Sequence, residues 1–336
     1  MNDAYPEEDY LDNTRICPLC NKTTTRHKCP ECGTGTVVMH DSLAKSRITT
    51  GHPIVLEQYE VHELIAKGGS AKVYSGIKTD KQFKVAIKII NKNTITTAAD
   101  LKRMKRGVLA CSLLNHPNIV KVYDYGETDS GEPVIVMEYI NGKTLREILN
   151  KEGPLDTKTT ILILKQLAEA LNYSHNQDII HRDIKPDNIM LEPDKDSYRI
   201  TLADFGVARW FKGGRRLKGG RRPSYTTVKG VSVGTPSYMS PEQINGLTDL
   251  DGRADIYGLG VVAYETLTGT NPFRHDELMD TLRAHLIEPI PDFPENIVKT
   301  APASLLKVIK RMLHKDRTRR IQSAASLIKA LSTIQD

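Results

Sequence analysis

Four of the five cysteines in this chain fall within residues 17–32, in two pairs of identical spacing. The stretch "CPLCNKTTTRHKCPECG" holds Cys17-x-x-Cys20 and Cys29-x-x-Cys32, with eight residues between the pairs. Two residues between thiolates let one tight turn direct both sulfurs at a single ion. Two such turns facing each other supply four sulfurs in the tetrahedron that Zn²⁺ prefers. The spacing therefore predicts a metal site.

This segment resembles a zinc ribbon built from two knuckles, and we expect structural Zn²⁺ on Cys17, Cys20, Cys29 and Cys32. Two disulfides or four unligated thiols are the less favoured alternatives, because the chain has an intracellular character. The module is too short to bury a core, so its folding should depend on the metal. We expect it to dock protein rather than nucleic acid. It follows an acidic tail (1–14), occupies 15–40, and is joined by a linker (41–57) to the main domain.

The main domain begins at Tyr59, where the pattern changes. Residues 59–90 contain three short, β-branched-rich runs separated by polar or glycine turns, which predict an antiparallel sheet. A helix is expected at about 98–114, followed by two more strand-like runs. After residue 155 the apolar periodicity is mainly helical. This order predicts an α+β fold with a small β-rich lobe, a larger helical lobe and a cleft between them.

Several motifs in this domain occur in the order and spacing found in eukaryotic-type protein kinases. They are "VAIK" (85–88), "HRDIKPDN" (181–188), "DFG" (204–206) and "GTPSYMSPE" (234–242). The chain resembles a Hanks-type Ser/Thr kinase over residues 59–334. The resemblance implies the two-lobed kinase fold and transfer of the γ-phosphoryl of Mg·ATP to protein hydroxyls.

The resemblance also assigns roles to individual residues. Asp183 would accept or orient the proton of the substrate hydroxyl, and Lys185 would hold the γ-phosphate. Asn188 and Asp204 offer oxygen ligands suited to Mg²⁺, and Lys88 would bind the α- and β-phosphates. Glu138 and Ile140 lie in the hinge expected to meet adenine, after the gatekeeper position Met137. Glu242 and Arg320 match a buried ion pair of the large lobe, and Asp255 matches the residue that braces the catalytic loop.

The expected glycine-rich loop departs from the family pattern. Two of its three glycine positions carry Ala66 and Ala71, whereas Gly68 is retained. Alanine lacks access to positive φ but remains small enough to let the loop approach a phosphate. We expect weakened rather than abolished nucleotide binding by the loop residues Ile65, Ala66, Lys67, Gly68, Gly69, Ser70, Ala71, Lys72 and Val73.

The helix expected at 98–114 contains a second departure. Counting back from "HPNIV", the position of the family's αC glutamate, which pairs with the strand lysine, is Gly107. A glycine inside a helix costs about 1 kcal/mol relative to alanine, and this one falls between Met104 and Cys111 on the apolar side. Lys88 therefore lacks the usual partner from this helix, and Asp204 could hold it instead.

Two functions remain open from this departure. In the first, the chain is an active kinase in which Mg·ATP and Asp204 order Lys88. In the second, it is a pseudokinase adaptor that binds nucleotide weakly. We favour the first, because a scaffold has no chemical need for all five of the polar residues Lys88, Asp183, Lys185, Asn188 and Asp204.

The segment between the last two motifs carries the chain's net excess of positive charge. Residues 205–241 contain eight Lys or Arg and no acidic residue, which leaves −2 for the rest of a chain with a net charge of +6. The near-repeat "KGGRRLKGGRR" suggests a flexible loop that could bind an acidic or nucleic-acid partner. Thr226 and Thr227 are the favoured phosphorylation candidates, since a phosphate there could pair with Arg182.

The overall composition is that of an ordinary soluble protein, 39% hydrophobic and 26% charged. The sequence contains no apolar run long enough to cross a bilayer, and its acidic start is unlike a signal peptide. We therefore expect a cytoplasmic protein without a membrane anchor that acts on protein substrates.

Overall fold

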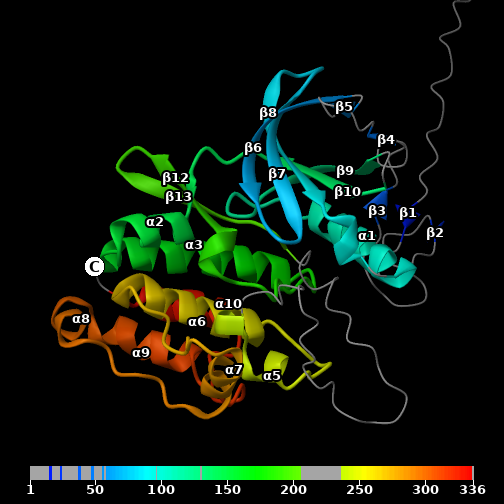
Figure 1. Ribbon diagram of the computed structural model, residues 1–336. Coiled ribbons are helices and arrows are strands. Elements are labelled where there is room, and N and C mark those ends of the chain that lie inside the picture. Colours follow the sequence, from blue (N-terminus) through cyan, green and yellow to red (C-terminus); the bar gives the residue numbers. More distant parts are fainter. Residues whose placement is uncertain are drawn as a thin grey trace, which may run out of the picture.

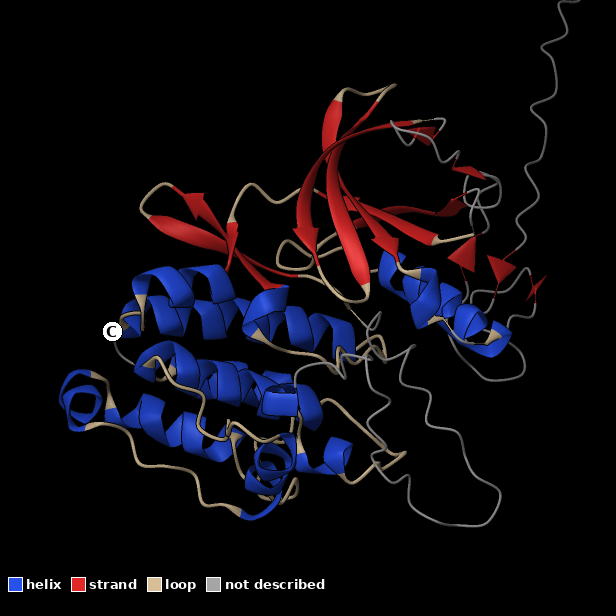
Figure 2. Ribbon diagram, in the orientation of Figure 1, coloured by secondary structure: helices blue, strands red, loops and turns tan. Residues whose placement is uncertain are grey.

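The computed structural model describes residues 58–95, 97–128, 131–205 and 236–334, and the backbone of five two-residue strands before residue 58. Within these residues the chain forms a β-rich lobe and a helical lobe, one above the other in Figure 1. Colouring by secondary structure separates the two lobes clearly (Figure 2). This confirms the two-lobed α+β architecture.

The sheet of the small lobe has the strand order β4-β9-β10-β8-β7-β6-β5. The five longer strands pair antiparallel, and they are β6 (Tyr59–Lys67), β7 (Ala71–Lys78), β8 (Phe83–Ile90), β9 (Val122–Thr128) and β10 (Pro133–Glu138). Two short strands, β4 (Arg47–Ile48) and β5 (Val55–Leu56), pair with β9 and β6. Both come from the segment that we expected to be a linker.

Alternation along the strands gives this sheet two apolar faces. Val85, Ile87 and Val136 pack in one cluster with Tyr59. On the opposite face, Ile90 and Ile135 form a cluster with Met104 and Val108 of helix α1 (Ala98–Ser112). Because successive side chains of a strand point to opposite faces, the same two strands serve both clusters. Helix α1 is thereby fixed against the sheet beside the cleft (Figure 1).

The large lobe is built from helices around one extensive apolar core. Its helices are α2 (Leu145–Glu152), α3 (Thr157–His175), α5 (Pro241–Ile244), α6 (Arg253–Thr268), α7 (Leu278–Ile287), α8 (Glu295–Thr300), α9 (Ala303–Met312) and α10 (Ala324–Ser332). Short 3₁₀ turns of this lobe are η3 (Pro186–Asn188) and η4 (Pro236–Tyr238), and η2 (Lys92–Thr94) lies in the small lobe between β8 and α1. A small sheet of β11 (Lys143–Thr144), β12 (Ile189–Asp194) and β13 (Ser197–Leu202) lies on the cleft side.

Helix α6 runs through the middle of this lobe and is buried from Ala254 to Leu267. Its glycines let neighbouring elements approach closely: a Cβ at Gly260 would lie 2.9 Å from the Cβ of Met312. A helix that is apolar all round belongs in the interior of a large core. It provides the rigid base from which Asp255 reaches the catalytic loop.

A separate three-stranded sheet of order β2-β1-β3 precedes the main domain. It consists of β1 (Arg15–Ile16), β2 (Thr23–Thr24) and β3 (Val37–Val38), all antiparallel. The four cysteines Cys17, Cys20, Cys29 and Cys32 lie outside the described residues. Among the helices that the structure describes, none combines the length and the apolar character needed to cross a membrane.

Candidate active site

The loop at 181–188 brings three of the predicted residues together. The carboxylate of Asp183 accepts hydrogen bonds from Lys185 Nζ at 2.8 Å and from Asn188 Nδ2 at 3.2 Å. The same Asn188 amide donates to the main-chain oxygen of Asp183 at 2.8 Å. A carboxylate that is held by two donors keeps one fixed orientation. Asp183 therefore presents a defined face to the cleft, as a proton acceptor requires.

Asp255 of α6 anchors this loop from below, as the sequence indicated. Its carboxylate accepts the main-chain N–H of His181 at 2.8 Å and of Arg182 at 2.6 Å, and contacts His175 Nε2 at 2.8 Å. Burial alone would raise the pKa of Asp255, but the hydrogen bond and charge of His175 hold that pKa below its usual value. These bonds also hold Arg182 at φ +69°, a strained region for a residue with a side chain.

Asp204 is placed beside Asn188 through main-chain contacts. The Ala203 N–H donates to the main-chain oxygen of Asn188 at 2.8 Å, and His181 Nε2 contacts the main-chain oxygen of Ala203 at 2.8 Å. Asp204 has φ +63°, and the next residue, Phe205, packs edge-on against His181 with ring centroids 4.6 Å apart. Asn188 and Asp204, the two residues predicted to supply oxygen ligands to Mg²⁺, thus lie on the same side of the cleft.

The donor set fits a magnesium ion. Mg²⁺ binds protein through one or two carboxylates, completing its shell with water and substrate phosphates. Asp204 offers a charged carboxylate and Asn188 a neutral carbonyl oxygen. Among the described residues no cluster of three His, Cys, Asp or Glu is arranged to hold a metal. The two protein oxygens of Asp204 and Asn188 suit an ion that takes its remaining ligands from water and phosphate.

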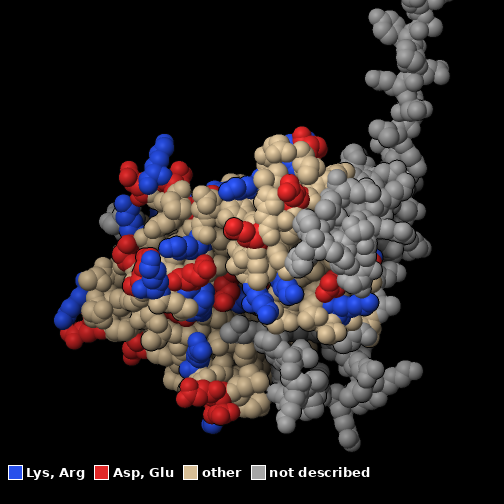
Figure 3. Space-filling model, turned by 45° about the horizontal axis from the view of Figure 1, so that its top comes forward, with Lys and Arg blue, Asp and Glu red and all other residues tan. Residues whose placement is uncertain are grey.

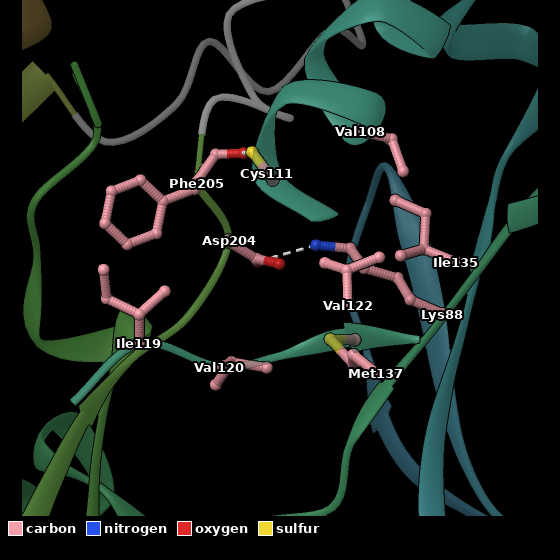
Figure 4. A pocket seen from close by; sticks show the side chains of 10 residues that line it. All are labelled: Lys88, Val108, Cys111, Ile119, Val120, Val122, Ile135, Met137, Asp204 and Phe205. Atoms are coloured by element: carbon pink, nitrogen blue, oxygen red, sulfur yellow. Dashed lines mark hydrogen bonds and ion pairs between the residues drawn. The ribbon is translucent and has the colours of Figure 1, made fainter. Parts of the chain in front are cut away.

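Lys88 of β8 reaches across the cleft to Asp204. Its Nζ lies 2.6 Å from Asp204 Oδ2, and the two side chains are only 13% and 29% exposed. Burial favours the neutral acid, but the Lys88 ammonium, and after it Lys185, hold the pKa of Asp204 below its usual value. Figure 4 shows this pair at the centre of the pocket. The alternative partner that we considered for Lys88 is the one that the structure shows.

Gly107 is buried on the sheet side of α1, as predicted. Its neighbours Val108 and Cys111 line a cavity of about 20 Å³ together with Lys88 and Met137. The Cys111 thiol donates to the main-chain oxygen of Phe205 at 3.1 Å, which ties α1 to the segment after Asp204 (Figure 4). Burial, and secondarily Asp204, raises the pKa of this thiol to about 12, so it stays protonated. The described side chains of α1 bring no carboxylate to Lys88.

The hairpin of β6 and β7 forms the expected glycine-rich loop over the cleft. Gly68 N–H donates to Ala71 O at 2.9 Å, and a Cβ at Gly68 would meet only that oxygen, at 3.6 Å. The fold itself therefore does not require glycine here. The missing side chain leaves space for an approaching ligand, which is what a phosphate cradle needs. The exposed loop residues are Ile65, Ala66, Lys67, Gly68, Gly69, Ser70 and Lys72, whereas Ala71 and Val73 are half-buried.

An apolar cluster lies behind this loop and includes the hinge. Ala86, Met137 and Ile140 belong to its buried part, and Val73 from β7 and Met190 from β12 pack against this cluster. The flat ring of a nucleotide such as adenine could be enclosed between the two lobes at this apolar cluster. The Glu138 carboxylate is bound by Arg199 Nη2 at 2.9 Å, so this residue can meet a nucleotide only through its main chain. Sequence reasoning missed Met190, because one apolar residue in a strand carries no distinguishing signal.

A family model described as the protein kinase domain matches residues 59–331. The chain belongs to the protein kinase family. It is 34% identical over 280 residues to the Ser/Thr-protein kinase pkn3 of Myxococcus xanthus, covering 82% of this chain and 50% of that protein. It is 36% identical over 275 residues to PknB of Mycobacterium tuberculosis, covering 81% and 42%. The chain thus spans about half the length of the curated relatives that it matches.

A solved structure supports the protein kinase fold independently. The crystal structure of Rad53 1-466 in complex with AMP-PNP aligns with a TM-score of 0.64 and 24% identity. The alignment covers 82% of this chain and 66% of that one. At this level of identity the alignment shows a shared fold. Residues 206–235, which include Thr226, Thr227 and all the cations of the basic segment, lie outside the described residues.

Proposed function

We propose that this chain is a Ser/Thr protein kinase. The observation that carries the proposal is the convergence of Asp183, Lys185 and Asn188 with the Lys88–Asp204 pair, between the lobes of a protein kinase domain. The printed names of the similar bacterial proteins, Ser/Thr-protein kinases, support the same activity. The substrates would be Mg·ATP and hydroxyl groups of proteins.

The residues divide the chemistry between them. Asp183 accepts the proton of the attacking hydroxyl, and Lys185, 2.8 Å away, places a positive charge where the transferred phosphoryl would lie. Asn188 and Asp204 would hold Mg²⁺, which when bound neutralises charge on the phosphates. The β6–β7 loop covers the nucleotide and keeps water from it. Most of the catalysis is positioning and charge stabilisation, because phosphoryl transfer needs little covalent chemistry from the protein.

Transfer of the labelled γ-phosphoryl of Mg·ATP tests this function. The full chain is incubated alone and with a generic basic protein, and label is followed on serine, threonine and tyrosine. We expect label on serine or threonine and its loss in Lys88→Met. Absence of label from the wild-type chain under saturating Mg·ATP would overturn the proposal.

We further propose that Lys88 changes partner when the site is loaded. In the structure Lys88 is bound to Asp204 at 2.6 Å, and the described part of α1 supplies no carboxylate to retain it. A nucleotide without metal must therefore displace Asp204 from Lys88 before its phosphates can use the ammonium. Lys88 therefore contributes little to the affinity for metal-free ATP while it is paired with Asp204.

A double-mutant cycle on metal-free ATP binding measures this exchange. In EDTA, Lys88→Met should change ATP affinity by less than about twofold in the wild-type background, but lower it on the order of tenfold in the Asp204→Asn background. Isothermal titration calorimetry supplies the four dissociation constants. An equal loss of affinity in both backgrounds would show that Lys88 is already available to the phosphates. The proposed exchange of partner would then be wrong.

Phosphorylation of Thr226 or Thr227 is proposed to order the basic segment. The support lies in Arg182, whose half-buried guanidinium has no hydrogen-bond partner at Nε among the described residues. Burial lowers its pKa despite the opposing effect of Asp255, so a second anion beside it would be stabilising. The six cations of the repeat are proposed to bind an acidic protein or a nucleic acid, in a manner that salt weakens.

We propose that the N-terminal cysteines hold structural Zn²⁺ in the cytoplasm, where thiols stay reduced. The repeated Cys-x-x-Cys spacing of the four cysteines Cys17, Cys20, Cys29 and Cys32 supports this proposal. The purified chain should contain one zinc per molecule by mass spectrometry of the intact protein. Replacing both Cys29 and Cys32 by serine should remove it, whereas Cys111→Ser should not. Retention of zinc in the double variant would contradict this site.

A further inference from the structure

A groove of about 570 Å³ opens on the large lobe, on the side away from the active site, between α8, α9 and the loop before α8. Ile290, Phe293, Val298 and Leu306 give it an apolar lining. Phe293 is fixed, because its ring packs against Tyr264 with centroids 4.9 Å apart. Val298 is 54% exposed. The volume is within the range of sites that bind small molecules or short peptide segments.

One wall of this groove is basic along its whole length. Lys307, Lys310, Arg311 and His314 line it from α9 and the residue positions just after it. Lys307, Lys310 and Arg311 are spaced i, i+3 and i+4 within α9, so they share one face of that helix. Lys310 is paired with Asp292 at 2.8 Å across the groove. Lys307 and Arg311 are exposed and have no ion-pair partner among the described residues.

This groove brings basic and apolar side chains together. On the face shown in Figure 3, acidic and basic side chains are interspersed over the described residues. The groove combines an apolar floor with two cations, Lys307 and Arg311, that have no ion-pair partner among the described residues. Its ligand should therefore carry carboxylates that flank apolar side chains, a combination that a peptide segment provides.

The N-terminal segment of this same chain has that chemistry. Residues 1–14 read "MNDAYPEEDYLDNT" and contain five acidic residues and no basic one. In "DYLD" the apolar pair Tyr10 and Leu11 lies between Asp9 and Asp12. We propose that this acidic segment docks in the α9 groove, with Tyr10 and Leu11 on the apolar floor and the two flanking carboxylates on Lys307 and Arg311. The contact goes beyond the proposed kinase activity and does not depend on it.

Binding of a labelled peptide of residues 1–14 tests this contact. The receptor is the full chain with its own five N-terminal carboxylates neutralised (Asp3→Asn, Glu7→Gln, Glu8→Gln, Asp9→Asn and Asp12→Asn), which leaves the groove open. Fluorescence anisotropy should show saturable binding that weakens with salt. The chain with its native N-terminus should bind the same peptide at least about fivefold more weakly, because its own segment competes.

Charge reversal identifies the site. In the neutralised receptor, Lys307→Glu with Arg311→Glu should weaken the peptide on the order of tenfold, since two attractive contacts become repulsive. The matched control, Lys165→Glu with Lys329→Glu, makes the same charge change on exposed lysines of α3 and α10 and should have little effect. A peptide with Tyr10→Ser and Leu11→Ser should also bind more weakly.

The basic loop is the competing destination for the acidic segment. Replacing its six clustered cations by alanine should leave peptide binding unchanged. If that replacement abolishes binding while the groove reversal does not, the segment binds the loop and the proposal is wrong. Equal losses in the groove reversal and in its matched control would likewise overturn it, because binding would then follow net charge alone.

Discussion

Asp183→Asn should lower γ-phosphoryl transfer by about 10²- to 10⁴-fold, the range lost with a general base. Asparagine preserves the size of the side chain and an oxygen that can accept from Lys185, which lies 2.8 Å from the carboxylate in the wild type. It cannot take a proton from the attacking hydroxyl. The loss should therefore appear in kcat, with ATP affinity changed by no more than about threefold.

The control for this variant is Asp196→Asn, in the exposed turn between β12 and β13. It removes the same charge from the same lobe and should leave transfer unchanged. Both variants should unfold at the wild-type temperature within about 2 °C. Transfer by Asp183→Asn at a wild-type rate would show that another group carries the proton, and the assignment of Asp183 would be incorrect.

Glu242→Ala should destabilise the large lobe by about 3 kcal/mol. In the wild type, Arg320 Nη1 and Nη2 lie 2.7 and 3.0 Å from the two oxygens of Glu242, and both side chains are buried. Removing the acid leaves a buried guanidinium without a counter-charge. We expect the lower end of the usual range, because Arg320 keeps a hydrogen bond to the Arg253 oxygen at 2.6 Å and lies over the Tyr257 ring.

Urea unfolding measures this loss as a lower midpoint at unchanged slope. The comparison is Glu295→Gln, which breaks an ion pair with Lys299 whose side chains are 82% and 69% exposed. An exposed pair contributes little, since water screens it, so its midpoint should stay at the wild-type value. Equal midpoints for Glu242→Ala and the wild type would mean that the buried pair adds no stability.

The groups that act within one short loop were predictable from the sequence. Asp183, Lys185 and Asn188 lie within six residues, so local geometry fixes their contacts once the loop is recognised. The two lobes followed from the change of apolar period near residue 155. The inward position of Gly107 followed from the helical spacing of Met104 and Cys111, and all three are buried.

Contacts between distant segments were harder to predict. The Lys88–Asp204 pair joins residues 116 positions apart, and the sequence offered it only as an alternative to the missing glutamate. Arg146 of α2 binds Glu265 of α6 at 2.9 Å and also contacts Tyr238, a network that no motif indicated. Such polar contacts depend on how helices pack, and apolar periodicity does not encode which charged residues will meet.

The Cys111 contact with Phe205 illustrates the same limit. In the sequence Cys111 is one apolar position of a helix, yet its thiol donates to the Phe205 oxygen at 3.1 Å. This bond links α1 to the segment after Asp204 in a chain whose helix lacks the usual glutamate. The consequence is that the described part of α1 is coupled to the active site through packing and one weak hydrogen bond rather than an ion pair.

The central claim is that this kinase domain transfers phosphate although Gly107 occupies the glutamate position. The most direct measurement compares kcat/KM for Mg·ATP in the wild type, Gly107→Glu and Lys88→Met. We predict transfer by the wild type, its loss in Lys88→Met, and a gain of no more than about tenfold in Gly107→Glu, whose new carboxylate would add a second partner for Lys88. No transfer from the wild type, with activity appearing only in Gly107→Glu, would contradict the claim and identify a pseudokinase that is inactive because it lacks this glutamate.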